Sequence, residues 1–216
     1  MSHPDAASLP GETKKPKMLL WLGRALILGL IVFFVQKYVL HYFSFTAASY
    51  GDFWPKASWL FPHLACGALA ILIGPLQFWP KMRANYLQAH RIAGRVYVVA
   101  VLVGSIAAYG LASKIDGGSA YSLGLAGLAT AWLTTTGMGF VAIRRKNLEQ
   151  HKQWMVRSYV VTFAFVTFRL CDDSMRAMHI MSDDERSKVL AWACWAVPLL
   201  VTELIIQGRA VFKARN

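Results

Sequence analysis

Six long apolar runs are the feature that most constrains the fold of this chain. They cover residues 18–40, 58–79, 92–113, 121–143, 154–170 and 189–207, and polar segments separate them. At about 1.5 Å per helical residue, such runs cross most or all of a hydrocarbon core roughly 30 Å thick. The mean hydropathy of +0.40 is also too high for an ordinary soluble domain. We therefore expect an all-α fold, a polytopic membrane bundle of six transmembrane helices.

The basic residues indicate the orientation of this bundle. They gather in residues 14–17, 81–91, 144–153 and 209–216, whereas the segments KIDGGSA and MSDDERSK are weakly charged or mixed. The positive-inside rule then places both termini in the cytoplasm. The expected organisation is a disordered cytoplasmic lead over residues 1–17, a six-helix transmembrane domain over 18–208 and a basic cytoplasmic tail over 209–216. This placement explains the net charge of +12 without nucleic acid as a partner.

The histidines form an inner and an outer layer in this topology. His90 and His151 lie at the cytoplasmic ends of the third and fifth spans. Two neutral imidazoles on facing helices can occupy both axial positions of a b-type haem, whose propionates need basic side chains near the interface. The inner layer offers such basic groups together with aromatic neighbours. The candidate cofactor-binding residues are His90, His151, Arg91, Arg95, Arg157 and Tyr97.

One hypothesis is therefore a redox protein in which His90 and His151 ligate the iron of haem b. Such a protein would be oxidoreductase-like and would exchange electrons with quinol or a redox partner protein. Two other classes stay open: a non-redox binding or assembly protein that holds a lipid, a quinone or a metal ion, and a small-molecule transporter. In the second class we expect Glu203 to pair with Arg95, and in the third we expect Gly74-Pro75 to break a helix.

The outer layer consists of His41, His63 and His179, at the outer ends of the first, second and fifth spans. Imidazole nitrogens suit copper and zinc, so these three residues are a weaker candidate for a second metal site. The three cysteines lie within or beside apolar spans without CxxC spacing. They indicate neither a disulfide framework nor a zinc knuckle.

The stretch from His151 to Arg169 has polar groups at both ends of an apolar run. The helical repeat puts six of its residues on one stripe, His151, Met155, Ser158, Thr162, Phe165 and Arg169. The hydroxyl groups on this stripe predict that it faces the interior of the bundle. Three interpretations of Arg169 stay open, because a charge within a span must pair, reach the interface or face a cavity. Arg169 faces an internal cavity, its long side chain reaches the interface, or Arg169 and Arg176 pair with Asp172 or Asp173.

Four segments carry a family resemblance. They are HLACGALAILIGPLQF from His63, HRIAGRVY from His90, AWLTTT in the fourth span, and HKQWMVRSY from His151 followed by FRL at Arg169. Together they resemble a bacterial family of predicted membrane proteins, domain of unknown function 2306. The resemblance covers residues 62–169 and implies a multi-span protein of the bacterial inner membrane. It implies no particular activity.

Two looser likenesses concern the chemistry of the histidines. HRIAG at His90 is similar to the HRxxG turn in the membrane anchor subunits of succinate dehydrogenase, where the His and Arg lie near quinone and a haem propionate. This likeness implicates His90 and Arg91. A small bundle with histidines on several helices also looks like cytochrome b561 and ferric reductase domains. Those domains carry two histidines on one span, a spacing that this sequence lacks, so the likeness implies at most one haem.

Overall fold

The computed structural model describes residues 17–213, which form a succession of helices without a strand, so the all-α prediction is confirmed. The α-helices are α1 (Lys17–Tyr38), α2 (Ala47–Tyr50), α3 (Ala57–Gln77), α4 (Pro80–Asn85), α5 (Leu87–Ala112), α6 (Gly118–Arg144), α7 (Leu148–Thr162), α8 (Ala164–Ala177) and α9 (Asp183–Lys213). Two 3-10 helices, η1 (Leu40–Ser44) and η2 (Gly51–Lys56), flank α2. The lead over residues 1–16 lies outside the described residues. The first residues of the expected tail continue α9.

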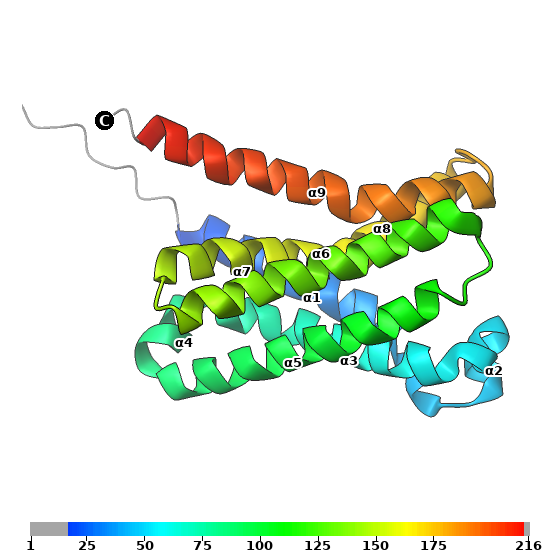
Figure 1. Cartoon of the computed structure of the whole chain (residues 1–216), viewed down its shortest axis with the longest axis horizontal. Coiled ribbons are helices and arrows are strands. Elements are labelled where there is room, and N and C mark those ends of the chain that lie inside the picture. Colours follow the sequence, from blue (N-terminus) through cyan, green and yellow to red (C-terminus); the bar gives the residue numbers. More distant parts are fainter. Residues whose placement is uncertain (1–16, 214–216) are drawn as a thin grey trace, which may run out of the picture.

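Six helical segments are long and apolar enough to cross a membrane, which confirms the predicted spans. They are Trp21–Tyr38, Ala47–Gln77, Leu87–Ala112, Gly118–Arg144, Leu148–Ala177 and Asp183–Phe212. The start of α1, helix α4, the turn between α6 and α7, and the end of α9 lie at the same end of the bundle (Figure 1). We call this the basic end and the opposite one the far end. Exposed basic residues at or near the basic end are Lys81, Arg83, Arg91, Arg95, Arg144, Arg145, Lys146 and Lys152.

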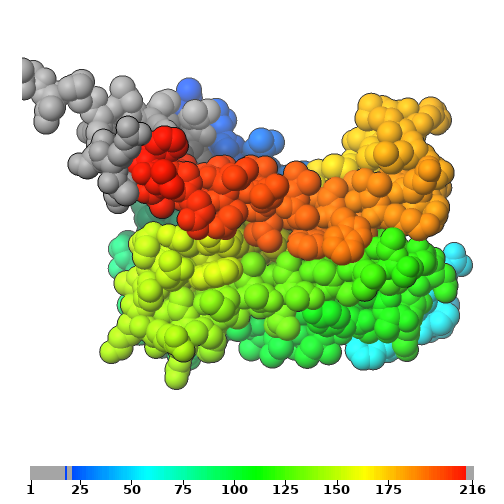
Figure 2. All heavy atoms as spheres, turned by 45° about the horizontal axis from the view of Figure 1, so that its top comes forward, coloured from blue at the N-terminus to red at the C-terminus, as the bar shows by residue number. Residues whose placement is uncertain are grey.

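Two antiparallel helix pairs form the centre of the bundle. α3 packs along α5, α6 packs along α7, and contacts between α5 and α6 join the two pairs. α9 lies over α6, α7 and α8 and forms a ridge along one flank (Figure 2). α1 packs on the bundle through a small cluster in which Ile31 and Phe34 meet Ile71 of α3 and Val166 of α8. Most other apolar side chains of α1 are exposed, as expected of a helix that faces lipid.

A hydroxyl network joins α5, α6 and α7 inside the bundle. The Tyr97 hydroxyl lies 2.8 Å from the hydroxyl oxygens of both Ser158 and Thr162. Thr136 lies 2.6 Å from the Ser158 oxygen, and the Trp132 indole donates to Thr162 over 2.9 Å. Tyr97, Thr136 and Ser158 are almost fully buried. The polar stripe predicted for the fifth span therefore faces inward, where its hydroxyls find partners that lipid would not provide.

The fifth span is interrupted, and the second is not. α7 ends at Thr162 and α8 begins at Ala164. The Thr162 hydroxyl donates to the Ser158 carbonyl over 2.9 Å, and this back-bonding competes with the hydrogen bonds of the helix. The prediction that Gly74-Pro75 breaks a helix is wrong, because α3 continues to Gln77.

A tyrosine on α7 accounts for the continuity of α3. Pro75 has no N–H and therefore leaves the Ile71 carbonyl, four residues earlier, without its helical donor. The Tyr159 hydroxyl donates to that carbonyl over 2.9 Å. Gly74 makes room for the ring, since a Cβ there would lie 1.8 Å from Tyr159 Cε2. Tyr159 on α7 and Gly74 on α3 together thus replace one missing backbone hydrogen bond.

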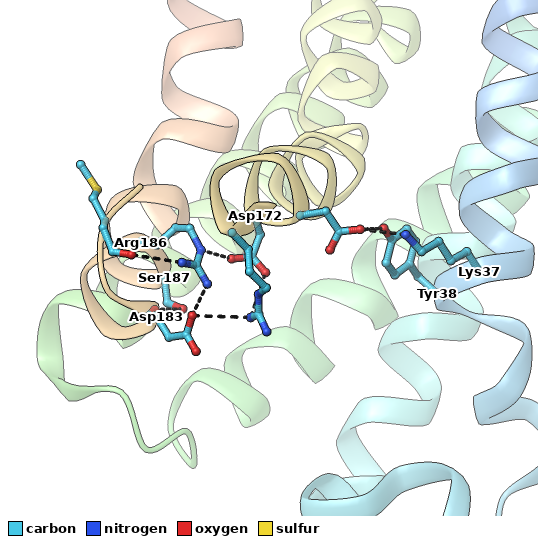
Figure 3. A network of polar contacts seen from close by, with 9 residues as sticks. Lys37, Tyr38, Asp172, Asp183, Arg186 and Ser187 are labelled. Atoms are coloured by element: carbon cyan, nitrogen blue, oxygen red, sulfur yellow. Dashed lines mark hydrogen bonds and ion pairs between the residues drawn. The ribbon is translucent and has the colours of Figure 1, made fainter. Parts of the chain in front are cut away.

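Ionised side chains tie α1, α8 and α9 together at the far end. Asp172 and Asp173 are neighbours on α8, and Asp172 faces Arg186 while the Asp173 carboxylate meets Lys37 and Tyr38 (Figure 3). The Arg186 Nε lies 2.5 Å from Asp172, and the Lys37 amine lies 2.8 Å from Asp173. Arg186 is only 2% exposed, so this ion pair is buried. Its hydrogen bonds hold α9 against α8.

We predict that Asp172→Asn destabilises the fold, because it removes the buried one of the two carboxylates that pair with Arg186 and leaves only the exposed Asp183. Because Asp183 still compensates the charge of Arg186, the expected cost is that of one lost buried hydrogen bond, about 1–3 kcal/mol. Asp184→Asn is the matched control, since it breaks the exposed Asp184–Lys188 pair and costs about 0–1 kcal/mol. Thermal unfolding of the protein in lipid nanodiscs measures both. Equal losses in the two variants would contradict the assignment of the buried pair.

A second prediction concerns the hydrogen bond that replaces the one missing at Pro75. Tyr159→Phe leaves the Ile71 carbonyl unpaired and costs about 1–3 kcal/mol of unfolding free energy. In a Pro75→Ala background the backbone N–H restored at this position serves that carbonyl, so the same Tyr159→Phe change costs much less. The coupling in this double-mutant cycle is the measurement. Equal costs in both backgrounds would show that the tyrosine does not replace the backbone donor.

Candidate functional site

The two inner histidines lie at the basic end, where α5 and α7 begin. His151 Nδ1 is 2.8 Å from the carbonyl oxygen of Gly139 on α6. Because a carbonyl only accepts, Nδ1 carries the proton and Nε2 presents a lone pair. His90 lies within electrostatic range of His151, and its Nδ1 is buried without a partner among residues 17–213. The fold therefore brings the two predicted ligands into the same region.

The basic residues predicted around this pair are arranged differently. Arg91 and Arg95 are exposed on α5. Arg157 is buried and pairs with Glu203 of α9, with Nη2 and Oε2 2.6 Å apart. The expected pair between Arg95 and Glu203 is therefore wrong, because α9 packs against α7 and brings Glu203 to Arg157. Tyr97 lies deeper, in the hydroxyl network.

An apolar cavity of about 170 Å³ lies between the middle of the bundle and the far end. Its lining comes from α1, α3, α5, α6, α7 and α8, and Tyr42 and Phe53 line it from the segment between α1 and α3. It reaches the hydroxyl network at Trp132 and Thr162. Most of the lining side chains are hydrophobic or aromatic, with few polar groups among them. This composition is typical of pockets that bind small organic molecules.

Arg169 is one of the two basic side chains that line this cavity. It extends the inward stripe of α7 onto α8 and lies near the ring of Phe168, 6.0 Å from the centroid. Arg176 pairs with Asp172, as one interpretation of the sequence expected, but Arg169 pairs with neither aspartate. Asp173 is already held by Lys37 and Tyr38. Within the described chain the Arg169 guanidinium has no hydrogen-bond or ion-pair partner, although Asp173 lies within electrostatic range of it, and its place in the cavity lining agrees with the cavity interpretation.

His63 on α3 is the second basic side chain of the cavity. Its Nδ1 lies 3.0 Å from the carbonyl oxygen of Gly104 on α5. α3 and α5 approach closely at this point, since a Cβ on Gly104 would lie 3.2 Å from the Cβ of Cys66 on α3. The imidazole meets Phe165 and Trp132 edge to face, with centroids 5.4 and 6.4 Å away. His63 is thus fixed in orientation by one hydrogen bond and two aromatic rings.

The three outer histidines do not come together in the fold. Across residues 17–213 no group of three or more His, Cys, Asp or Glu side chains is placed to hold a metal ion. His41 packs on Tyr42, with ring centroids 3.9 Å apart, and His179 is exposed in the turn after α8. The 3-10 helix η1 carries His41 away from His63, which faces the cavity instead.

The site that the structure presents most clearly is one that sequence patterns find only in part. Arg169 is detectable because a charge inside an apolar span is rare. His63 is detectable as a ligand-capable residue, but its hydrogen bond to Gly104 and its place in a cavity depend on three-dimensional packing. The apolar lining comes from six helices, and no local spacing connects its members.

These observations define the class of protein: a polytopic helical membrane protein with an internal cavity. The chain belongs to the family described as Predicted membrane protein (DUF2306), whose sequence model matches residues 60–206. This confirms the resemblance seen in the sequence and extends it into α9. No curated protein and no solved structure matches the chain. The likeness to cytochrome b561 stays a prediction. α1, η1, α2 and η2 precede the matched residues.

Proposed function

We propose that this protein binds an amphipathic small molecule from the bilayer in its apolar cavity. The observation that carries the proposal is the Arg169 guanidinium, which lines the cavity without a partner among the described side chains. The side chain is half-buried, the Asp173 carboxylate within its electrostatic range is already bound by Lys37 and Tyr38, and a cation in apolar surroundings favours an acceptor that can pair with it. A ligand whose polar group accepts from Arg169 would provide this partner. Its apolar part would contact the aromatic and aliphatic lining.

The cavity volume limits the size of the bound group. About 170 Å³ is close to the roughly 150 Å³ of an apolar protein cavity that binds benzene. A single ring or a short branched group fits this space. A longer tail would have to leave it between helices. We expect such a tail to leave the cavity beside α1, since α1 lines the cavity with Phe34 and Tyr38 and packs on the bundle through few side chains.

The test is to identify what co-purifies with the protein. We expect mass spectrometry of an organic extract to find an amphipathic molecule with wild-type protein and at least about tenfold less with Arg169→Leu, equivalent to about 1.4 kcal/mol. Arg169→Lys keeps the charge and should retain more of the molecule. Gly67→Leu should also lose it, because Gly67 lines the cavity and a side chain there meets open space.

Gly137→Leu is the matched control for the cavity-filling change. Gly137 lies on α6, does not line the cavity, and a side chain there also meets no atom within 4 Å. This variant should retain the molecule at the wild-type level. Identical extracts from all four variants and the wild type would overturn the proposal.

A second candidate function is the binding of haem b by His90 and His151. Metal-ligating histidines usually donate their other ring nitrogen to a carbonyl or carboxylate, and His151 makes such a contact with Gly139. His90 has a buried Nδ1 without a partner in the described chain, and exposed Arg91 is its neighbour. Haem would supply one-electron transfer at the basic end, to or from quinol or a redox partner. Arg157 and Tyr97 are engaged elsewhere, so they add no support.

Absorption spectra of oxidised and dithionite-reduced protein test the haem hypothesis. A bis-histidine haem gives a reduced alpha band in the wild type, and this band should be absent from His90→Ala and His151→Ala. Glu203→Gln is a useful control, because it changes a charge at the same end of the bundle on a residue that pairs with Arg157. Wild-type protein that remains colourless after haem is supplied would exclude this function.

A further inference from the structure

The hydrogen bond of His63 decides which of its ring nitrogens carries the proton. Nδ1 lies 3.0 Å from the Gly104 carbonyl oxygen, and a carbonyl oxygen has no proton to donate. Nδ1 must therefore be the donor. In the neutral imidazole this leaves the lone pair on Nε2. His63 thus presents a hydrogen-bond acceptor on the side of its ring opposite α5.

This acceptor belongs to the cavity. His63 lines it, Nε2 has no partner among residues 17–213, and the atom is not among the fully buried unpartnered ones. The flanking rings of Phe165 and Trp132 also line the cavity. The Thr162 hydroxyl, which also lines the cavity, is engaged with the Ser158 carbonyl, Trp132 and Tyr97. The cavity therefore offers an acceptor to which a ligand with an O–H or N–H group can donate.

The two basic side chains need opposite hydrogen-bonding partners. Arg169 has donors only and is satisfied by an oxygen that accepts. His63 in its neutral form needs an O–H or N–H group that donates. A ligand with a hydroxyl group on an apolar body meets the second need, and a second oxygen meets the first. The aromatic lining and the single-ring volume favour an aromatic body, since rings pack edge to face with histidine, phenylalanine and tryptophan.

We infer that the ligand is a lipid-soluble phenol of the hydroquinone type, whose hydroxyl group donates to Nε2 of His63. This inference rests on the proposed function, because it names the chemical class of the molecule in the same cavity. The oxidised quinone and the aryl ether of the same ring carry only acceptor oxygens. Either would place a lone pair against the lone pair of Nε2, and neither could complete the hydrogen bond.

Three ring compounds with the same alkyl tail test this discrimination. They are an alkyl hydroquinone, its dimethyl ether and the corresponding quinone, measured under anaerobic conditions with the protein in lipid nanodiscs and with empty nanodiscs to correct for partitioning. We expect the hydroquinone to bind at least about tenfold more tightly than the other two, since a buried acceptor left unpaired is penalised. Gly67→Leu should abolish the binding of all three.

Two variants at His63 distinguish the loss of the Nε2 acceptor from a loss of folding. His63→Asn keeps an amide that can donate to the Gly104 carbonyl but has no atom at the position of Nε2. The affinity of this variant for the hydroquinone should therefore fall to its affinity for the dimethyl ether. His63→Gln has an amide that can turn and either donate or accept, so it should bind hydroquinone and quinone about equally. Thermal unfolding near the wild-type value confirms that each variant is folded.

The outcomes separate this inference from the proposed function. Equal wild-type affinities for the three compounds, all lost in Gly67→Leu, would overturn the phenol assignment and leave the cavity as a binding site. Preference for the quinone would also overturn it. Failure of all three to bind would overturn it as well, and the extraction experiment on the Arg169 variants then judges the proposed function by itself.

Discussion

Polar groups inside an apolar bundle must find their partners within the bundle, and this constraint organises the protein. In lipid no water replaces a missing hydrogen bond, so each unsatisfied group costs several kcal/mol. Pro75 creates such a deficit at the Ile71 carbonyl, and Tyr159 meets it from another helix. The hydroxyls of Tyr97, Ser158 and their neighbours meet one another. Some polar groups among residues 17–213 lack such a partner, and Arg169 is one that lines the cavity, which is why this cavity is the candidate site.

Glycines at helix crossings fix the hydrogen bonding of two histidines. Gly104 and Gly139 lie where helices approach closely, and each offers its carbonyl to a histidine of the neighbouring helix. The contact fixes the orientation of the ring and the position of its proton. His63 and His151 therefore both present Nε2 as an acceptor. The first faces the apolar cavity, and the second lies at the basic end beside His90. The same contact between a glycine carbonyl and a histidine thus provides an Nε2 acceptor at two different places in the bundle.

The hydroxyl network that borders the cavity makes more hydrogen-bond contacts than it has hydroxyl protons. Four hydroxyl groups take part, those of Tyr97, Thr136, Ser158 and Thr162, and they make five contacts with one another and with backbone carbonyls. Each hydroxyl has one proton, so at any moment one contact lacks a proton between its oxygens. With the threonine protons on their carbonyls, the Tyr97 and Ser158 protons can serve only two of the three hydroxyl–hydroxyl contacts at a time. The network can therefore rearrange its protons without any movement of the helices.

The sequence by itself determined the class of fold and the six spans. Apolar runs of this length are typical of membrane-spanning segments, and they form helices because their backbone N–H and C=O groups must be hydrogen-bonded within the segment. It also indicated Arg169 and the inward stripe of the fifth span, since charges and hydroxyls in such runs are rare and face inward. Partners across helices depend on which helices touch. Tertiary structure alone decided that Glu203 meets Arg157, that Tyr159 preserves α3 beside Pro75, and that Gly104 holds His63 at a cavity. No local spacing encodes these contacts, because each joins residues that are distant in the chain and near only after the bundle has packed.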